Sequence, residues 1–446
     1  MKKLLLTSCV LVAMATQAQS WVPQGTKFPT NFGTDEIVIT DANTAWTFAY
    51  DGSGGGTYPQ IVSRTTNGGT TWTTANITGP GTNALISDLA AVNSTTAWVI
   101  TAPSEAGPLA NKIYKTTDGG TSWASQTVGF TAPSFGNQIY FWDANEGWAC
   151  GDPLGGSYEM YKTMNGGTTW TVVANRPASI GDYSYVGLKE VVGNTIWFGS
   201  DIGRIFRSSD RGLNWTSYFS PVTDFGGVTT SGSSGVMAFK DTSNGLLIAV
   251  DGAGAVGTTS AVLYSTTDGG ASWDPVTTTG TWYFGDITHV PGTANTYVST
   301  GINSGAPNFM GSSYSTDGGL TWTSIDAGVQ RGKVQFLNPT TGWAGQFSNG
   351  TTGTTGILKF NGNFLATGEN AVKSGLKIYP NPAVDVVNVT AKQPIKAISI
   401  FDMTGKKLQS SKSTSQVNVS SLVKGTYILQ VFYGDGAVEN TKLIKK

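Results

Sequence analysis

Cysteine and histidine are nearly absent from this chain of 446 residues, which has two of the first and one of the second. Because Cys9 falls in the expected leader, Cys150 would be alone in the mature protein, and no intramolecular disulfide could support the fold. We expect Cys150 to be a small buried side chain. The single histidine, His289, excludes a histidine-rich metal site, and we predict neither a metal nor a cofactor.

Charged residues are also scarce, at 12% of the chain, and they are unevenly distributed. Residues 21–365 hold 14 Lys and Arg against 23 Asp and Glu, whereas residues 376–446 hold 10 Lys against 4 acids. The larger part is therefore acidic and lacks a basic stripe, which argues against a nucleic-acid partner. The change of sign between the two ranges also indicates two domains.

An apolar run at the N-terminus is too short to span a bilayer. "LLLTSCVLVAMA" follows the basic "MKK" and precedes the small residues "TQA", an arrangement typical of a signal peptide cleaved after Ala18. We therefore predict that residues 1–18 are a signal peptide and that the mature protein is exported.

Glycine and tryptophan are abundant, and they gather in a turn that recurs six times, as in "IYKTTDGGTSW" at 113–123. Its Asp or Asn accepts hydrogen bonds from later amides, its glycines take positive φ, and its Trp buries a large apolar face. Because a catalytic site is needed once and this turn recurs, we interpret its residues as structural. They are Asn67, Trp72, Asp118, Trp123, Asn165, Trp170, Asp210, Trp215, Asp268, Trp273, Asp317 and Trp322.

A second ladder of large residues has a more regular period, with spacings of 52, 50, 49, 50, 50 and 46 residues. Its members are Trp46, Trp98, Trp148, Trp197, Leu247, Tyr297 and Trp343. A period near 50 with several strands per unit predicts a β-propeller, here of seven units. The last unit lacks its final strand, and residues 21–28 resemble that strand. We therefore expect them to pair near residues 357–360 and to close the ring.

The pattern S/T-x-D/N-x-G-x-x-W resembles the Asp-box, or BNR repeat, of bacterial sialidases, xyloglucanases, sortilin and photosystem II assembly-factor propellers. The unit "GWACGD…YKTMNGGTTW" is most similar to the assembly-factor type. The resemblance implies that these turns lie away from the ligand face. We predict an all-β chain, with a seven-bladed β-propeller over residues 19–365 closed by the N-terminal strand, and a small C-terminal β-sandwich.

The C-terminal region, residues 376–446, reads as short alternating strands after a linker at 366–375. "IYPNP", "ISIFDMTGKKL", "LVKGTYILQVF" and the final lysines resemble the type A C-terminal sorting domain of the type IX secretion system of Bacteroidetes. The resemblance implies export across the outer membrane with the type IX machinery as partner. It also implies that the tail is removed there and that the protein is then secreted or attached to the cell surface.

Catalytic signatures are weak in the propeller. Its six arginines do not supply the convergent triad of a sialidase, and the F/Y-R-I-P motif is missing. A different glycoside hydrolase would need two carboxylates across a cleft. Asp182 and Asp286 lie in loops between the predicted blades, and we keep them as the catalytic pair of this alternative. The alternative substrate is an extracellular polysaccharide.

Binding is the function that the sequence favours over catalysis, with a glycan or a protein as ligand. Loops at the expected ligand face are rich in aromatic residues, as in "SIGDYSY" and "TWYFGD". Aromatic side chains there could stack on sugars or a peptide, and arginines could donate directed hydrogen bonds. The alternative interpretation is that these aromatics plug the channel or cover blade edges. The predicted ligand-binding residues are Arg176, Asp182, Tyr183, Trp282, Tyr283, Asp286 and Arg331.

Overall fold

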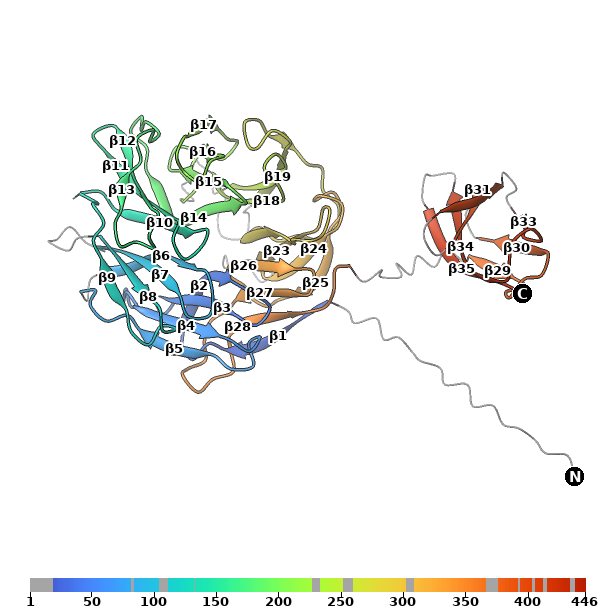
Figure 1. Cartoon of the computed structure of the whole chain (residues 1–446), viewed down its shortest axis with the longest axis horizontal. Helices are drawn as coiled ribbons and strands as arrows, with labels where there is room; N and C mark the ends of the chain where they lie inside the picture. Colours follow the sequence, from blue (N-terminus) through green and yellow to red (C-terminus); the bar gives the residue numbers. More distant parts are fainter. Residues whose placement is uncertain are drawn as a thin grey trace, which may run out of the picture. The chain divides into compact units, whose positions relative to one another are not determined.

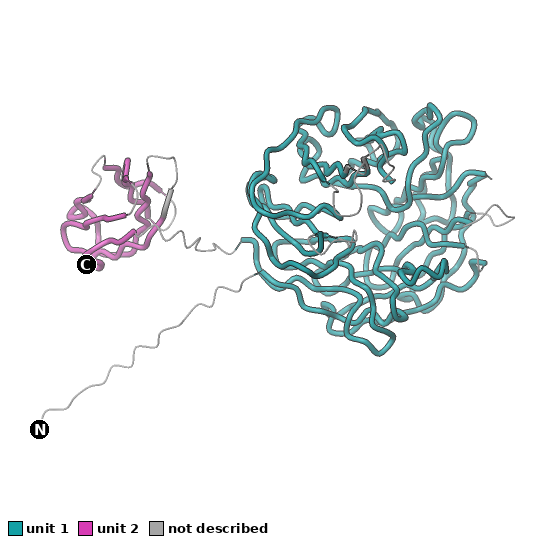
Figure 2. The backbone as a smooth tube through the Cα atoms, turned by 180° about the vertical axis from the view of Figure 1, so that it is seen from behind, with its two compact units in different colours: residues 1–365 teal, residues 366–446 magenta. Residues whose placement is uncertain are grey.

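The computed structural model describes residues 19–81, 84–103, 111–131, 133–226, 233–251, 260–301, 309–365, 376–391, 394–402, 406–411, 415–433 and 438–446. The chain divides into two compact units, residues 1–365 and 366–446 (Figure 2). The predicted signal peptide, residues 1–18, and the predicted linker, residues 366–375, lie outside the described residues. No helix in the described part of the chain is long and apolar enough to cross a membrane.

The first unit is the all-β propeller that the period predicts, and its described residues form seven four-stranded antiparallel sheets around a central axis (Figure 1). The strands nearest the axis are β2 (Phe32–Ile39), β6 (Ala84–Ala91), β10 (Gly136–Phe141), β14 (Ser184–Val192), β18 (Ser233–Phe239), β22 (Asp286–His289) and β26 (Val334–Asn338). The second strands are β3 (Ala45–Asp51), β7 (Ala97–Pro103), β11 (Gly147–Leu154), β15 (Thr195–Ser200), β19 (Gly245–Asp251), β23 (Tyr297–Gly301) and β27 (Thr341–Gly345).

The outer half of each sheet contains the repeated turn or its counterpart. The third strands are β4 (Ile61–Thr65), β8 (Lys112–Thr116), β12 (Ser157–Thr163), β16 (Arg204–Ser208), β20 (Ser260–Thr266), β24 (Gly311–Ser315) and β28 (Gly356–Asn361). The outermost strands are β5 (Thr73–Asn76), β9 (Ala124–Gln126), β13 (Thr171–Val172), β17 (Thr216–Phe219), β21 (Asp274–Pro275), β25 (Thr323–Ala327) and β1 (Ser20–Gly25).

The N-terminal strand closes the ring, as predicted. β1 pairs antiparallel with β28 over its whole length, from Ser20 opposite Asn361 to Gly25 opposite Gly356. Trp21 packs edge-on against Phe360, with ring centroids 5.6 Å apart. The last sheet is therefore built from both ends of the propeller, and the edge of β28 is covered rather than exposed.

Buried tryptophans of the second strands connect neighbouring sheets. Nε1 of Trp98, which is fully buried, donates 3.1 Å to the carbonyl of Gly166 in the next sheet's turn. Lys115 lies over the same indole ring at 5.0 Å, and its Nζ donates to the same carbonyl. Arg64 lies over Trp46 in the corresponding way. Basic residues of the propeller are thus used to join sheets, which leaves fewer of them for a ligand.

The repeated turns are held by hydrogen bonds within the turn. In the turn at 116–123, Oγ1 of Thr116 accepts the N–H of Gly120 at 2.9 Å, and Oδ1 of Asp118 accepts the N–H of Ser122 at 3.0 Å. Gly120 has a φ of 89°, which a side chain would disfavour. Both hydrogen bonds recur in all six turns, with 2.8–3.0 Å for the first and 2.9–3.0 Å for the second.

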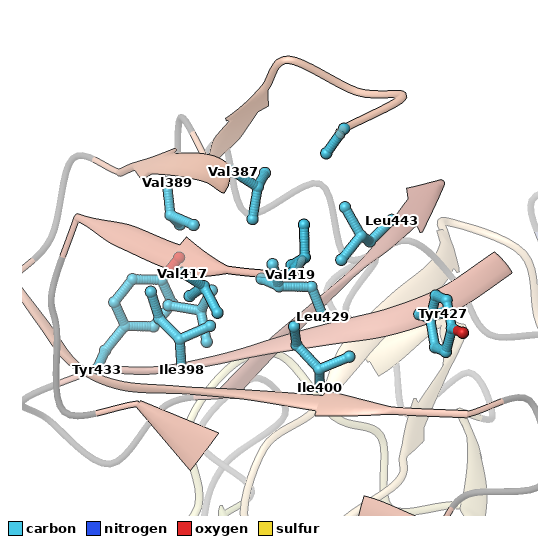
Figure 3. Packing of buried hydrophobic residues seen from close by; sticks show 12 residues of the cluster. Val387, Val389, Ile398, Ile400, Val417, Val419, Tyr427, Leu429, Tyr433 and Leu443 are labelled. Carbon is cyan, nitrogen blue, oxygen red and sulfur yellow. The ribbon is translucent and has the colours of Figure 1, made fainter. Parts of the chain in front are cut away.

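The second unit is a small β-sandwich. One sheet consists of β29 (Lys377–Tyr379), β30 (Val386–Thr390) and β33 (Gln416–Asn418). The other sheet consists of β32 (Lys407–Ser411), β31 (Ile395–Phe401), β34 (Gly425–Tyr433) and β35 (Val438–Lys445). Val387, Ile400 and Leu429 are fully buried between the sheets (Figure 3). This unit has its own apolar core, as an independently folding domain requires.

Candidate ligand-binding cavity

A cavity of about 230 Å³ lies among the inner strands of the propeller. Residues on or beside β2, β6, β10, β14, β22 and β26 line it, so six of the seven sheets contribute. Its walls contain apolar side chains such as those of Leu89 and Phe141. Its charged lining residues are Glu36, Lys189, Glu190, Asp286 and Lys333.

Irregular strand pairing accompanies several of these charges. The register between β2 and β3 shifts between Thr34 and Ile37, at Asp35 and Glu36. The register between β6 and β7 shifts directly before Asp88. A β-bulge re-aims the side chains around it and is often found beside functional sites. Inner strands that are mostly apolar can in this way present a charged group to the axis.

The largest irregularity is in β14. Between Ser184 and Lys189, this strand advances five residues while its partner β15 advances two. The inserted backbone is fixed by Gln138 of the neighbouring inner strand, whose Nε2 donates to the carbonyls of Tyr185 and Leu188, at 3.0 Å each. The insertion is therefore an ordered part of the cavity wall.

Lys189 forms an ion pair with Asp88, which belongs to an inner strand two sheets away. The Nζ–Oδ2 distance is 2.7 Å, and the two side chains are 6% and 0% exposed. Asp88 also accepts the N–H of Ile139 at 2.7 Å. Burial raises the pKa of Asp88, and the adjacent Lys189 holds it lower than burial alone would. The pair joins three inner strands and needs no ligand to be satisfied.

Asp286 and Lys333 form a second charged group at the cavity. Oδ2 of Asp286 accepts the N–H of Val334 at 2.8 Å, which joins β22 to β26. Burial raises the pKa of Asp286, and Lys333 opposes that rise. The pKa of Lys333 is raised in turn, chiefly by the charge of Asp286 and against the effect of burial. Both groups have surface on the cavity.

Among the carboxyls that line the cavity, Glu190 has the largest change in pKa. Burial raises its pKa to about 8, and the negative charge of Asp286 adds to the rise. Asp35, beside Glu36, has its pKa raised to about 6 by burial. A carboxyl that stays protonated near neutral pH can donate a hydrogen bond or a proton, and a nearby cation would favour its ionised form.

Two residues predicted to bind a ligand are inside the protein. Arg331 is 2% exposed, pairs with Asp326 and lies 5.7 Å from the ring centroid of Trp21. Tyr283 is 3% exposed, and its hydroxyl donates to the carbonyl of Asp326. Trp282 is half-buried and stacks on Trp322 at 6.0 Å. Tyr283 and Arg331 thus have packing roles here, and neither offers surface to a ligand.

The remaining predicted residues lie in different surroundings. Asp182 is buried and pairs with Arg204 at 3.1 Å, whereas Asp286 lies at the central cavity. The two carboxylates share no hydrogen-bond partner among the described residues. Arg176 is half-buried, and its Nε has no partner in the described structure. Tyr183 is 44% exposed and available to a ligand. Of the seven predicted residues, only Asp286 lines the cavity.

Sequence reasoning missed four of the five charged residues that line the cavity: Glu36, Lys189, Glu190 and Lys333. A signal for them existed, because "TDEIVI", "LKEVV" and "GKVQF" place charges in or directly before the apolar inner strands that precede Trp46, Trp197 and Trp343. Inner strands are expected to be core elements, so the charges within them were not predicted to bind a ligand. Only the closed ring brings these strands together around one axis.

The described residues contain no group of three or more His, Cys, Asp and Glu side chains placed to hold a metal ion. Cys150 is fully buried, and burial raises the pKa of its thiol well above the usual value. A buried thiol with a raised pKa is a poor nucleophile. The lone histidine, His289, packs edge-on against Tyr297 at 5.2 Å.

Solved propellers resemble this chain in fold. The structure of YCF48 bound to D1 peptide has a TM-score of 0.54 at 16% identity, covering 79% of this chain and 99% of that one. YCF48 from Cyanidioschyzon merolae has a TM-score of 0.50 at 17% identity, covering 77% and 99%. The GH74 enzyme of Niastella koreensis reaches 0.48 at 15% identity, covering 96% and 74%, which is too weak to bear on function.

Sequence comparison informs only the C-terminal unit. No curated protein matches the chain in sequence. Residues 377–446 match the family described as the secretion system C-terminal sorting domain. This match agrees with the motifs of the tail and supports export to the outside of the cell or to its surface. The chain is therefore a β-propeller followed by a type IX secretion sorting domain.

Proposed function

We propose that this protein is an exported binding protein whose ligand, a glycan or a protein, occupies the central cavity of the propeller. The observation that carries the proposal is the convergence of five charged side chains on one cavity of about 230 Å³. Burying charges without full pairing is costly, and residues whose pKa is shifted by burial and by a charged partner in a cavity are candidates for a functional site. The signal peptide at 1–18 and the tail would deliver the propeller to the cell surface or the medium.

The composition of the cavity favours binding as the main activity. The cavity surface is mostly polar, so charge and hydrogen bonds would hold a ligand there, and convergent polar groups of this kind fix orientation and specificity in preformed sites. YCF48, a propeller of the same fold, has been solved with a bound peptide, which supports a protein ligand without identifying it. The repeated turns have their hydrogen bonds satisfied internally, so we place no ligand there.

A binding screen with the whole protein tests this proposal. Soluble polysaccharides and a peptide library would be assayed by thermal shift and then by calorimetry. A ligand of the cavity should lose at least tenfold in affinity with Glu190→Gln or Lys333→Met. Asp274→Asn, which changes an exposed acid on the outer strand β21, is the matched control and should bind normally. Ligands that bind all four proteins equally would place the site elsewhere.

A glycoside hydrolase is the second candidate function, and the pKa of Glu190 favours it. A carboxyl with a pKa of about 8 suits a general acid, and Asp286 or Glu36 would serve as its base or nucleophile. Asp182, which pairs with Arg204, is poorly placed for that role. Release of reducing sugar that is abolished by Glu190→Gln, with substrate affinity retained, would establish the enzyme. Binding without turnover would favour the first candidate.

A further inference from the structure

The end of the cavity wall at β14 has an exposed apolar rim, which we define as Ile180, Tyr183, Val186 and Ile202. Their exposed fractions are 65%, 44%, 45% and 37%. The N–H of Tyr183 donates 2.9 Å to Oδ1 of Asp201, which places the loop before β14 against the loop that follows β15. Ile180, Tyr183 and Ile202 therefore come from adjacent loops at one end of this sheet, and Val186 lies in the irregular first part of β14.

The rim is continuous with the cavity. Val186 is followed by Gly187, which lines the cavity and has a φ of 60°. A Cβ atom at Gly187 would lie 3.4 Å from a carboxylate oxygen of Glu36. Glu36 belongs to β2, the inner strand of another sheet. The β14 insertion thus leads directly from exposed apolar side chains to the charged lining. An extended segment resting on the rim could place a side chain at the cavity.

Negative charge predominates around this end of β14. Asp201 has its pKa raised by burial and then by the negative charges of Asp182 and Asp224. Arg204 is already paired with Asp182, and Lys189 is already paired with Asp88. At the cavity, Glu36 and Asp286 face Lys333, which has no ion-pair partner among the described residues. Glu190 is protonated near neutral pH, and a bound cation would favour its ionised form. A cationic group would complement this surface better than an anionic one.

We propose that the rim and the cavity together bind an extended basic peptide segment of another protein, with hydrophobic side chains on the rim and a lysine or arginine in the cavity. This inference rests on the proposed binding function and names its ligand class. The charge excess and the apolar rim both favour such a segment, whereas a neutral glycan would gain little from the charge excess.

Fluorescence anisotropy with the whole protein and two labelled decapeptides tests the inference. One probe alternates lysine and valine, and the other alternates glutamate and valine. The basic probe should bind at least tenfold more tightly than the acidic one. Raising the salt concentration from 50 to about 500 mM should weaken it by tenfold or more, because charge attraction is screened. Equal affinity of the two probes would overturn the inference.

Matched variants locate the contact. Tyr183→Ala and Glu190→Gln should each weaken the basic probe at least fivefold. Tyr58→Ala, which removes another exposed tyrosine, and Asp274→Asn should leave its affinity within twofold. If Glu190→Gln fails to fold, Asp201→Asn instead tests the negative charge beside Tyr183 of the rim. Unchanged affinity in both Tyr183→Ala and Glu190→Gln, or in both Tyr183→Ala and Asp201→Asn, would also overturn the inference.

The two proposals can fail separately. If a polysaccharide or an acidic or neutral peptide binds and is lost with Glu190→Gln, while the basic probe does not bind, the cavity function stands and its basic-peptide ligand is wrong. If no ligand in either assay responds to Glu190→Gln or Lys333→Met, both proposals are wrong.

Discussion

Nε1 of Trp343 donates a 3.0 Å hydrogen bond to Oε1 of Gln24, which lies 319 positions earlier in the chain. The same oxygen accepts the indole N–H of Trp72 at 3.2 Å. One side chain of the N-terminal strand therefore satisfies tryptophans of the last sheet and the first repeated turn. Ring closure thus depends on specific hydrogen bonds as well as on backbone pairing.

Gln24→Ala should destabilise the propeller by about 1–3 kcal/mol, because it leaves two largely buried indole N–H groups without an acceptor. Urea unfolding followed by tryptophan fluorescence would measure the loss. Val22→Ala changes a neighbour on the same strand that is 47% exposed, and it should stay within about 0.5 kcal/mol of the wild type. A Gln24→Ala protein as stable as the control would show that β1 contributes through its backbone alone.

Thr116→Val removes a buried hydroxyl of a repeated turn and keeps the side-chain shape. We expect a loss of about 1–2 kcal/mol, because the N–H of Gly120 and the carboxylate of Asp118 lose their partner. Thr127→Val, at an exposed site, is the control. Thermal unfolding would measure both. Ligand affinity should be unchanged in folded protein, and a selective loss of binding would contradict the structural role of these turns.

Asp182→Ala should act on stability rather than on chemistry. It leaves the guanidinium of Arg204, whose side chain is 10% exposed, without its partner, and breaking such a buried pair costs about 3–5 kcal/mol. Chemical denaturation would measure the loss, with Asp274→Ala as the exposed control. If Asp182→Ala abolished an activity while the unfolding curve stayed in place, the catalytic pair predicted from sequence would be supported instead.

The contribution of Glu190 to the free energy of unfolding should fall as the pH rises from about 4.5 to 8. Its pKa is raised to about 8 in the folded protein, so the folded state holds this proton over that window while the unfolded state has lost it. Glu190→Gln should therefore have a flatter dependence of Tm on pH. His289, whose burial lowers its pKa to about 4, gives an opposite slope below pH 6.5.

Comparing wild type with Glu190→Gln cancels the His289 contribution, because both proteins contain it. Differential scanning calorimetry at pH 5, 6.5 and 8 would supply the comparison. The difference in Tm should move in favour of the variant as the pH rises. If the Tm of the two proteins changes with pH in parallel, the pKa of Glu190 is not raised in the folded protein.

Removing residues 376–446 should retain the protein in the periplasm while the propeller still folds, because each unit has its own buried core. Cell fractionation would locate the protein, and the melting transition of the purified propeller would check its folding. Val423→Ser, at a position 78% exposed, is the control within the tail and should be exported. Delivery of the truncated protein to the surface would contradict the sorting role.

The repeat and the tail could be predicted because their signals are local. A turn such as residues 116–123 forms most of its hydrogen bonds within eight residues, so its composition reveals its structure directly. Closure by residues 21–28 was also predictable, since the last unit lacked one strand and the N-terminus offered one. The motifs "IYPNP" and "LVKGTYILQVF" likewise indicated the sorting domain without a structure.

The candidate site was not predictable in the same way. Tyr183 and Tyr283 look alike in sequence, as aromatic residues in loops before inner strands, yet one is 44% exposed and the other 3%. Burial depends on which neighbouring sheet covers a loop, and that is a property of the assembled ring. The same holds for Arg331, whose role is set by its contact with Trp21 of the N-terminal strand.

Local hydrogen bonding, strand alternation and a repeat near 50 residues were enough to specify an all-β propeller, and the motifs of the tail were enough to specify the sorting domain. The cavity required the closed ring, because Glu36, Lys189, Glu190, Asp286 and Lys333 come from four sheets and face one axis only after closure. Burial and neighbouring charges then shift the pKa values of four of them, which are Lys189, Glu190, Asp286 and Lys333. Such shifts depend on distances between residues that are up to about 300 positions apart in the chain, and no local pattern encodes those distances.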